Sequence, residues 1–338
     1  MEDIEKAWSS FMSGDYNLET PKAVQTCVSP LPTCETLSIS TKTMISYLTH
    51  SIPLQETFWR IPIIPYIEPN VGVIKKQMKF SATSQEELNL LNHKIEQTKL
   101  LEAPPYVEDS VLTHIVNPGG IIPFKSVHKI SIGLSKKDIA SYRCKKRSAF
   151  YNCFVVILRV LHEDIYREIH VKVFNTGKLE IPGIQTPGLL PKILELLVSI
   201  LRPIIPIKTG IIDFDASKNE TVLINSNFNC GYFVDRDKLY GCLRNKYRIN
   251  CAYDPCSYPG IQCEFYYDTR KKVKDGRQPT INKSKCCLLE NDKQFIYKVS
   301  FMIFRTGSVL IVGKCTESIL NDIYDFIKNI LAEEYKHI

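Results

Sequence analysis

Residues 303–313 read Ile-Phe-Arg-Thr-Gly-Ser-Val-Leu-Ile-Val-Gly, and residues 173–183 read Val-Phe-Asn-Thr-Gly-Lys-Leu-Glu-Ile-Pro-Gly. In both stretches the Phe, the Thr-Gly pair and the final Gly keep the same spacing, and an apolar run precedes the Phe. Each stretch is followed by a helical pattern of apolar residues, at 189–201 and at 317–335. A repeated strand-turn-strand-helix unit predicts one fold that is built from two similar halves.

The composition sets no unusual constraint on the fold but favours one class of partner. The chain has 338 residues, which is enough for one large or two modest hydrophobic cores. Its content of 44% hydrophobic and 23% charged residues is ordinary for a globular protein. The formal net charge of +7 favours an anionic partner such as nucleic acid.

The 12 cysteines suggest a disulfide set at first sight. The first residues lack the basic flank and apolar stretch of a signal peptide, and no apolar run is long enough for a transmembrane helix. We therefore expect reduced thiols in an intracellular protein. A zinc site is suggested by Cys251, Cys256, Cys263, Cys286 and Cys287, but their spacing matches no paired zinc motif, so buried thiols and no metal are predicted.

The chain divides into a tail and two repeats. Residues 1–32 are an N-terminal tail or arm, 33–205 the first repeat with an insertion at about 80–130, and 206–217 a linker. Residues 218–338 are the second repeat, with a Lys-rich insertion at about 268–292. Periodicity predicts strands at 37–44, 71–80, 129–134, 154–160, 169–174, 178–181, 221–228, 249–253, 261–267, 295–304 and 308–312, and helices at 53–59, 84–101, 189–201, 235–245 and 317–335.

The second repeated strand pair is apolar on both of its faces. On one face lie Val299, Phe301, Ile303, Val309 and Ile311, and on the other lie Met302, Phe304, Leu310 and Val312. A sheet covered by helices on one side needs only one apolar face, and two helices per half are too few to cover both. The sequence therefore predicts an uncovered apolar face, which is typical of an interaction surface.

At these residues the chain resembles the TATA-box-binding protein family. In that family, a Tyr-Glu-Pro and a Phe-Pro-Gly segment precede a strand of the second repeat, and an Ile-Phe-x-Ser-Gly-Lys hairpin precedes the last helix. The corresponding residues here are Tyr-Asp-Pro at 253–255, Tyr-Pro-Gly at 258–260 and Ile-Phe-Arg-Thr-Gly at 303–307. Residues 301–314 and the helix after them are similar to the divergent members encoded by large nucleocytoplasmic DNA viruses. The resemblance covers residues 33–335 and is stronger in the second half.

The resemblance implies an α+β fold: a saddle of two pseudo-symmetric repeats that form a curved antiparallel sheet, with helices on the convex face. It further implies that the concave face binds the minor groove of double-stranded, A·T-rich DNA. Members of the family are a standard example of proteins that insert aromatic wedges between base steps and kink the duplex. Flexible pyrimidine–purine steps deform most easily, so the shape of the DNA contributes to sequence preference.

The family's functional positions carry over to particular residues of this chain. Phe304 and Tyr258 match the wedges of the second half, and Phe174 matches one wedge of the first half, with Phe150 or Tyr151 as the other. Leu310 and Val312 match residues that line the groove. Asn227, with Asn225 as the alternative, matches the Asn that reads the centre of the minor groove, where A·T pairs offer only acceptors. Arg305 and Lys178 follow the wedge phenylalanines and are expected to contact DNA.

The first repeat departs from the family pattern. Glu180 and Pro182 stand where the family has groove-lining residues, and a carboxylate facing DNA is unfavourable unless it is neutralised or turned away. Basic clusters at 143–147 and 270–274 are either solvated loop charge or phosphate contacts.

The predicted function is that of a DNA-binding general transcription factor that bends promoter DNA and helps to recruit RNA polymerase through a transcription factor B-like protein. The alternative is a scaffold of the same fold that binds proteins in a viral transcription or virion assembly, without bending DNA. No nucleotide-binding or hydrolase motif occurs, so neither catalytic activity nor a cofactor is predicted. The resemblance implies an intracellular location, in the host cytoplasm or nucleus or packaged in the virion, with no membrane contact.

Overall fold

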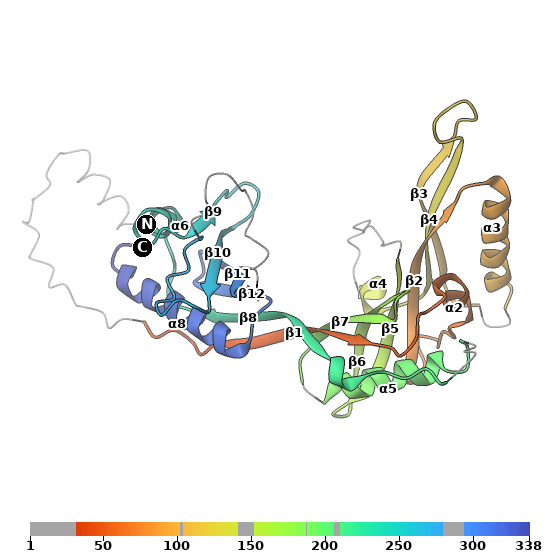
Figure 1. Ribbon diagram of the computed structural model, residues 1–338, viewed down its shortest axis with the longest axis horizontal. Helices are drawn as coiled ribbons and strands as arrows, with labels where there is room; N and C mark the ends of the chain where they lie inside the picture. The colour runs from red at the N-terminus through yellow and green to blue at the C-terminus, as the bar shows by residue number, and fades with distance from the viewer. Residues whose placement is uncertain (1–31, 102–103, 141–151, 187, 206–209, 280–293) are drawn as a thin grey trace, which may run out of the picture. The chain divides into compact units, whose positions relative to one another are not determined.

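A computed structural model describes residues 32–101, 104–140, 152–186, 188–205, 210–279 and 294–338 (Figure 1). The first half contains β1 (Ser38–Tyr47), α2 (Leu54–Arg60), β2 (Gly72–Ala82), α3 (Gln85–Lys99), β3 (Val107–Val116), β4 (Phe124–Gly133), α4 (Lys136–Ala140), β5 (Cys153–His162), β6 (Ile165–Phe174), β7 (Lys178–Ile184) and α5 (Leu189–Leu201). The second half contains β8 (Glu220–Asn229), α6 (Arg236–Gly241), a π-helical turn (Cys242–Lys246), β9 (Asn250–Ala252), β10 (Gly260–Asp268), β11 (Ile296–Phe304), β12 (Ser308–Gly313) and α8 (Glu317–Glu334).

All of these strands belong to one sheet in the order β3-β4-β2-β5-β6-β7-β1-β8-β12-β11-β10-β9. Every pairing in it is antiparallel. From the centre outward, β1-β7-β6-β5-β2 and β8-β12-β11-β10-β9 repeat the same connectivity, and the two first strands pair with each other. The predicted α+β fold of two similar repeats is therefore confirmed.

The repeated Thr-Gly pair forms the same turn in both halves. Gly177 and Gly307 both have φ of 81°, a conformation that residues with a side chain rarely adopt. Their amides donate to the carbonyls of Phe174 and Phe304, each at 3.0 Å. A Cβ atom would lie 2.5 Å from the His50 carbonyl at the first turn and 2.3 Å from the Tyr232 carbonyl at the second. The spacing seen in the sequence is thus a requirement of backbone geometry.

Each half has its own hydrophobic core on one face of the sheet, and Figure 1 shows α5 and α8 each running beside the strands of its own half. The α5 helix buries seven apolar side chains against β5, β6 and β7, and α8 buries six against β10, β11 and β12. The Thr316 hydroxyl caps α8 by accepting a hydrogen bond from the Ile319 amide at 3.3 Å. The two cores share no residue, so the sheet is what joins the halves.

The insertion at about 80–130 consists of α3 and the β3–β4 hairpin, which extends the sheet beyond β2. Ser84 caps α3, since its hydroxyl accepts a hydrogen bond from the Glu87 amide at 3.2 Å. The sequence did not predict β3, because most of its side chains are exposed and give no apolar alternation. The predicted helix at 235–245 is also only partly right, because it changes to π geometry at Cys242.

Of the cysteines proposed as buried thiols, Cys263 is buried, Cys251 is half-buried and Cys256 is exposed, while Cys286 and Cys287 lie outside the described residues. In the part of the chain that the structure describes, no cluster of three or more potential metal ligands occurs. None of its described helices is both long and apolar enough to cross a membrane.

Candidate nucleic-acid interface

The second half presents a half-exposed apolar surface on the face of the sheet that points away from α8. Phe301, Ile303, Val309 and Ile311 point toward α8 and are 0% exposed. The residues between them on β11 and β12 lie on the opposite face and are only half-buried, namely Met302, Phe304, Leu310 and Val312. We call this surface, together with Tyr258, Asn225 and Asn227, the open face. It is the surface that the alternation of apolar residues predicted.

Tyr258 and Phe304 form an aromatic pair at one end of the open face. Their ring centroids are 5.9 Å apart, and the rings are inclined by 58°. Gly260 lies opposite Phe304 in the β10–β11 ladder, and a Cβ atom on it would come within 3.0 Å of the Phe304 ring and 3.1 Å of the Tyr258 ring. Glycine at this position therefore leaves room for two neighbouring aromatic side chains, both half-exposed.

The Tyr258 hydroxyl also has a partner, which the sequence did not indicate. It donates a hydrogen bond to the Met302 sulfur at 3.7 Å. The structure thus brings together two predicted wedge residues and adds Met302 and Gly260 to the same cluster.

Asn225 and Asn227 lie near the middle of the sheet, where β8 pairs with both β12 and β1. Asn227 is opposite Leu310, and Asn225 is opposite Val312. The exposed Asn227 donates from Nδ2 to the Ser40 hydroxyl at 2.7 Å, whereas the buried Oδ1 atom of Asn225 has no hydrogen-bond partner in the described structure. The four predicted side chains therefore form adjacent apolar and amide rows, and the amide groups offer donors to groove acceptors.

The corresponding face of the first half is polar. Phe174 is half-buried, and the Lys178 ammonium lies 5.8 Å from its ring centroid. Glu180 forms an ion pair of 2.5 Å with Lys172 on the neighbouring strand, so its carboxylate is neutralised within the sheet. Pro182 lies on the same face as Glu180. Phe150 and Tyr151 lie outside the described residues.

Of the basic residues predicted to contact DNA, Arg305 is exposed in the turn after Phe304, and Lys178 begins β7. The cluster at 143–147 lies outside the described residues. In the cluster at 270–274, Arg270 pairs with Asp268 at 2.9 Å, and Lys274 donates to the Asp268 carbonyl at 2.7 Å. These two cations hold their own loop together.

A polar network bounds the open face at its outer end. The Glu264 carboxylate pairs with Lys298 and accepts hydrogen bonds from Tyr266 at 2.8 Å and Asn250 at 2.7 Å. Partial burial alone would raise the pKa of Glu264, but the bonds from Lys298 and Tyr266 outweigh it, and the pKa is lowered. The carboxylate therefore stays ionised and paired, and the apolar surface ends at this network.

Comparison with known proteins agrees with the motifs. The chain is similar to a protein of Acanthamoeba polyphaga mimivirus described as "TATA-box-binding protein-like", with 26% identity over 223 residues. The match covers 60% of this chain and 54% of the relative, so it spans about half the length of that relative. This similarity confirms the resemblance that the repeated hairpins and the Tyr-Pro-Gly segment indicated.

Among solved structures, the TBP of Methanococcus jannaschii aligns with 88% of this chain and 99% of its own. The sequence identity is 12% and the TM-score is 0.37. No protein-family profile matches the chain.

Proposed function

We propose that the protein is a TBP-like general transcription factor that binds the minor groove of promoter DNA through the open face and bends the duplex. The observation that carries the proposal is the alternation on β11 and β12, where every second apolar side chain stays half-exposed although a covered core lies directly beneath. An apolar surface of this kind is costly unless a partner covers it. The minor groove of a kinked duplex, which presents sugar and base edges, is a suitable partner.

The open face supplies each element that such a complex needs. Phe304 and Tyr258 are the wedge pair, and partial unstacking of a base step by such residues costs a few kcal/mol. Leu310 and Val312 contact the widened groove, which repays that cost by burying apolar surface. The amides of Asn225 and Asn227 donate to the N3 and O2 acceptors of A·T pairs.

The two halves contribute unequally in this proposal. The Lys172–Glu180 ion pair in the first half replaces an apolar groove lining with a neutral polar one, so that half presents less apolar surface to DNA. In that half, Phe174 still acts as a wedge between base steps, and Lys178 contacts a DNA phosphate. We therefore expect an asymmetric complex in which the second half causes most of the bend.

The partners that this function requires are a transcription factor B-like protein and RNA polymerase. They would dock on helices α5 and α8 or on the loop between β9 and β10. The protein would then act inside the cell, in a viral factory, in the nucleus or from the virion. The description of the mimivirus relative as "TATA-box-binding protein-like" supports the TBP-like role from which these partners follow.

Fluorescence energy transfer across an end-labelled A·T-rich duplex tests the proposal. The wild type should raise the transfer efficiency, Phe304→Ala should abolish most of the increase, and Phe174→Ala should reduce it less. Phe295→Ala is the matched control, because Phe295 is also an exposed phenylalanine but precedes β11 at its opposite end. Circular dichroism verifies that each variant is folded.

Bending that neither Phe304→Ala nor Phe174→Ala alters would refute the wedge assignment. If the wild type neither binds nor bends the duplex at low salt, the protein is instead a scaffold for protein partners, and the open face is its protein-binding surface.

A further inference from the structure

The first half contains a pocket that the proposed DNA complex does not use. Its volume is about 590 Å³, and it lies on the face of the sheet that carries Glu180 and Phe174. Arg159 of β5 and Glu168 of β6 are cross-strand neighbours at its floor. One wall is the loop between α2 and β2, with Tyr66 and Pro69, and the other is α4.

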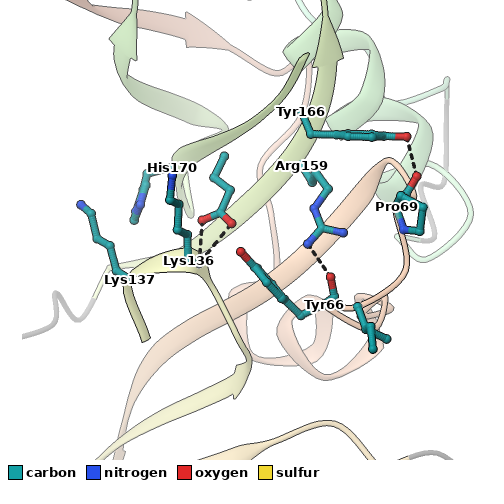
Figure 2. Close-up of a pocket in the computed structure, with 9 residues that line it drawn as sticks. Tyr66, Pro69, Lys136, Lys137, Arg159, Tyr166 and His170 are labelled. Carbon is teal, nitrogen blue, oxygen red and sulfur yellow. Dashed lines mark hydrogen bonds between the residues drawn. The ribbon is translucent and has the colours of Figure 1, made fainter. Parts of the chain in front are cut away.

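Hydrogen bonds hold both walls to the floor. The Arg159 guanidinium donates to the backbone carbonyls of Tyr66, at 2.8 Å, and of Glu68, and the Tyr166 hydroxyl donates to the carbonyl of Pro69. On the other side, the Glu168 carboxylate accepts from the Lys136 amide at 3.0 and 3.1 Å. Figure 2 shows the contacts of Arg159 with Tyr66 and of Tyr166 with Pro69, and it places Lys136, Lys137 and His170 together at one side of the pocket. The pocket is therefore built by long-range contacts between four segments of the chain.

The lining carries excess positive charge. Lys136, Lys137 and Arg159 face a single carboxylate, that of Glu168, which already accepts from a backbone amide. Neither lysine side chain forms an ion pair with any residue that the structure describes. Arg159 is 6% exposed, and its hydrogen bonds go to neutral carbonyls. Its charge is consequently held in place at the floor, next to the Glu168 carboxylate on the neighbouring strand.

His170 lies beside these cations, and its pKa depends on them. Burial lowers its pKa, and the neighbouring Lys137 lowers it further, more than Glu168 and Asp138 raise it. A neutral imidazole supplies both a donor and an acceptor to a bound group. Lysine side chains with no carboxylate partner, in a concave site, favour an anion.

We infer that this pocket binds a phosphate-bearing ligand of about nucleotide size, with Lys136 and Lys137 contacting the phosphate and Arg159 providing fixed charge beneath it. The volume falls within the range of about 300–1,000 Å³ that is usual for small-molecule sites. Ammonium groups form strong charge-assisted hydrogen bonds with phosphate oxygens. The phosphate belongs either to a free nucleotide or to a nucleic-acid strand, and neither source requires the second half to bend DNA.

Titration calorimetry of the full chain with inorganic pyrophosphate tests the assignment. We expect one site per chain, and in the double variant Lys136→Ala/Lys137→Ala the affinity should fall by about tenfold or more. The matched control is Lys94→Ala/Lys99→Ala on α3, which removes the same charge from exposed positions outside the pocket and should leave the affinity unchanged. Because Lys136 and Lys137 are exposed, their replacement should not unfold the chain.

Two further titrations identify the source of the phosphate. ATP that binds more tightly than pyrophosphate and is not displaced by duplex DNA indicates a free nucleotide. Displacement of pyrophosphate by an unlabelled duplex indicates a DNA phosphate. The inference is wrong if pyrophosphate does not bind, or if both double variants weaken binding equally. Bending by the Lys136→Ala/Lys137→Ala variant, measured as above, is judged separately, because bending tests the proposed function and pyrophosphate binding tests the pocket.

Discussion

At the residue scale, position on one face or the other of β11 determines what each side chain can do. Phe301 and Phe304 are both phenylalanines of one strand, yet Phe301 is 0% exposed among the core residues and Phe304 is half-exposed beside Tyr258. Replacing Phe301 with alanine should cost about 3–5 kcal/mol of stability, because it empties a packed site. Phe304 lacks that packing, so its replacement should leave the fold intact. This difference makes the bending experiment interpretable.

Lys76 is the clearest case of a single side chain that makes stability depend on pH. It is 4% exposed, donates to the Ile61 carbonyl at 2.7 Å and lies 5.1 Å from the centroid of the Phe58 ring. Burial lowers its pKa from 10.5 to about 7. Above pH 7 the unfolded chain therefore binds more protons at this site than the folded chain does, and stability rises with pH.

We expect the free energy of unfolding to gain about 1 kcal/mol from this site between pH 7 and pH 8, since the limiting slope is about 1.4 kcal/mol per pH unit. Lys76→Met should remove that gain. Urea unfolding of the wild type and the variant at both pH values measures it, because other titrating groups cancel in the difference. Lys99→Met on the exposed side of α3 is the control, and an equal slope in the wild type and Lys76→Met would contradict the prediction.

At the scale of elements, the β3–β4 hairpin is held together by a series of hydrogen-bonded polar side chains. Asp109 accepts from His128 Nδ1 at 2.9 Å, His128 Nε2 is 2.8 Å from the Ser126 hydroxyl, and that hydroxyl is 3.1 Å from His114 Nδ1. The order is that of a Ser-His-Asp triad, but Ser126 is 0% exposed and cannot reach a substrate. These hydrogen bonds therefore satisfy buried polar side chains and join β3 to β4.

Replacing His128 with alanine leaves Asp109 and Ser126 without their shared partner. Ser126, which is buried, then keeps only His114 as a side-chain partner, and we expect the free energy of unfolding to fall by about 1–3 kcal/mol, the usual cost when a buried polar group loses a hydrogen bond. His114→Ala is the control. His114 is at the exposed end of this series of hydrogen bonds, so its replacement should cost less than about 1 kcal/mol. Urea unfolding measures both, and equal costs would show that the hydrogen-bonded chain does not stabilise the hairpin.

At the scale of the whole molecule, two separate cores are attached to one continuous sheet. The ladder between β1 and β8 is the main link between them, helped by ion pairs such as Lys42–Glu317 at 2.6 Å. Backbone ladders and exposed ion pairs couple halves more weakly than a shared apolar core does. The halves should therefore open as separate units under native conditions.

Hydrogen exchange of two core variants tests this. Leu197→Ala in α5 should cost about 2–5 kcal/mol and speed exchange in β5, β6 and β7, while β10, β11 and β12 stay protected. Ile323→Ala in α8 should give the reverse pattern, and both residues are almost fully buried. Equal acceleration in all strands for either variant would show that the molecule unfolds as one unit.

The sequence was most informative where local geometry is strict. The spacing around Gly177 and Gly307 predicted the duplication because only glycine fits those turns, and the alternation on β11 predicted an uncovered face because side chains of a strand alternate by necessity. It was least informative at β3, whose exposed side chains follow no apolar period. The π turn at Cys242 was likewise missed, because periodicity does not distinguish helix types over five residues.

The sequence by itself determined the two repeats, the helices α5 and α8 that close them, the resemblance to TATA-box-binding proteins and the apolar row on β11 and β12. All of these depend on local spacing, which neighbouring residues set. Only the tertiary structure decided that Lys172 neutralises Glu180, that Gly260 admits two aromatic rings, and that Lys136, Lys137 and Arg159 line one pocket. Those contacts join residues that are distant in the chain, and their pairing follows from sheet register and long-range packing, which the spacing of residues does not encode.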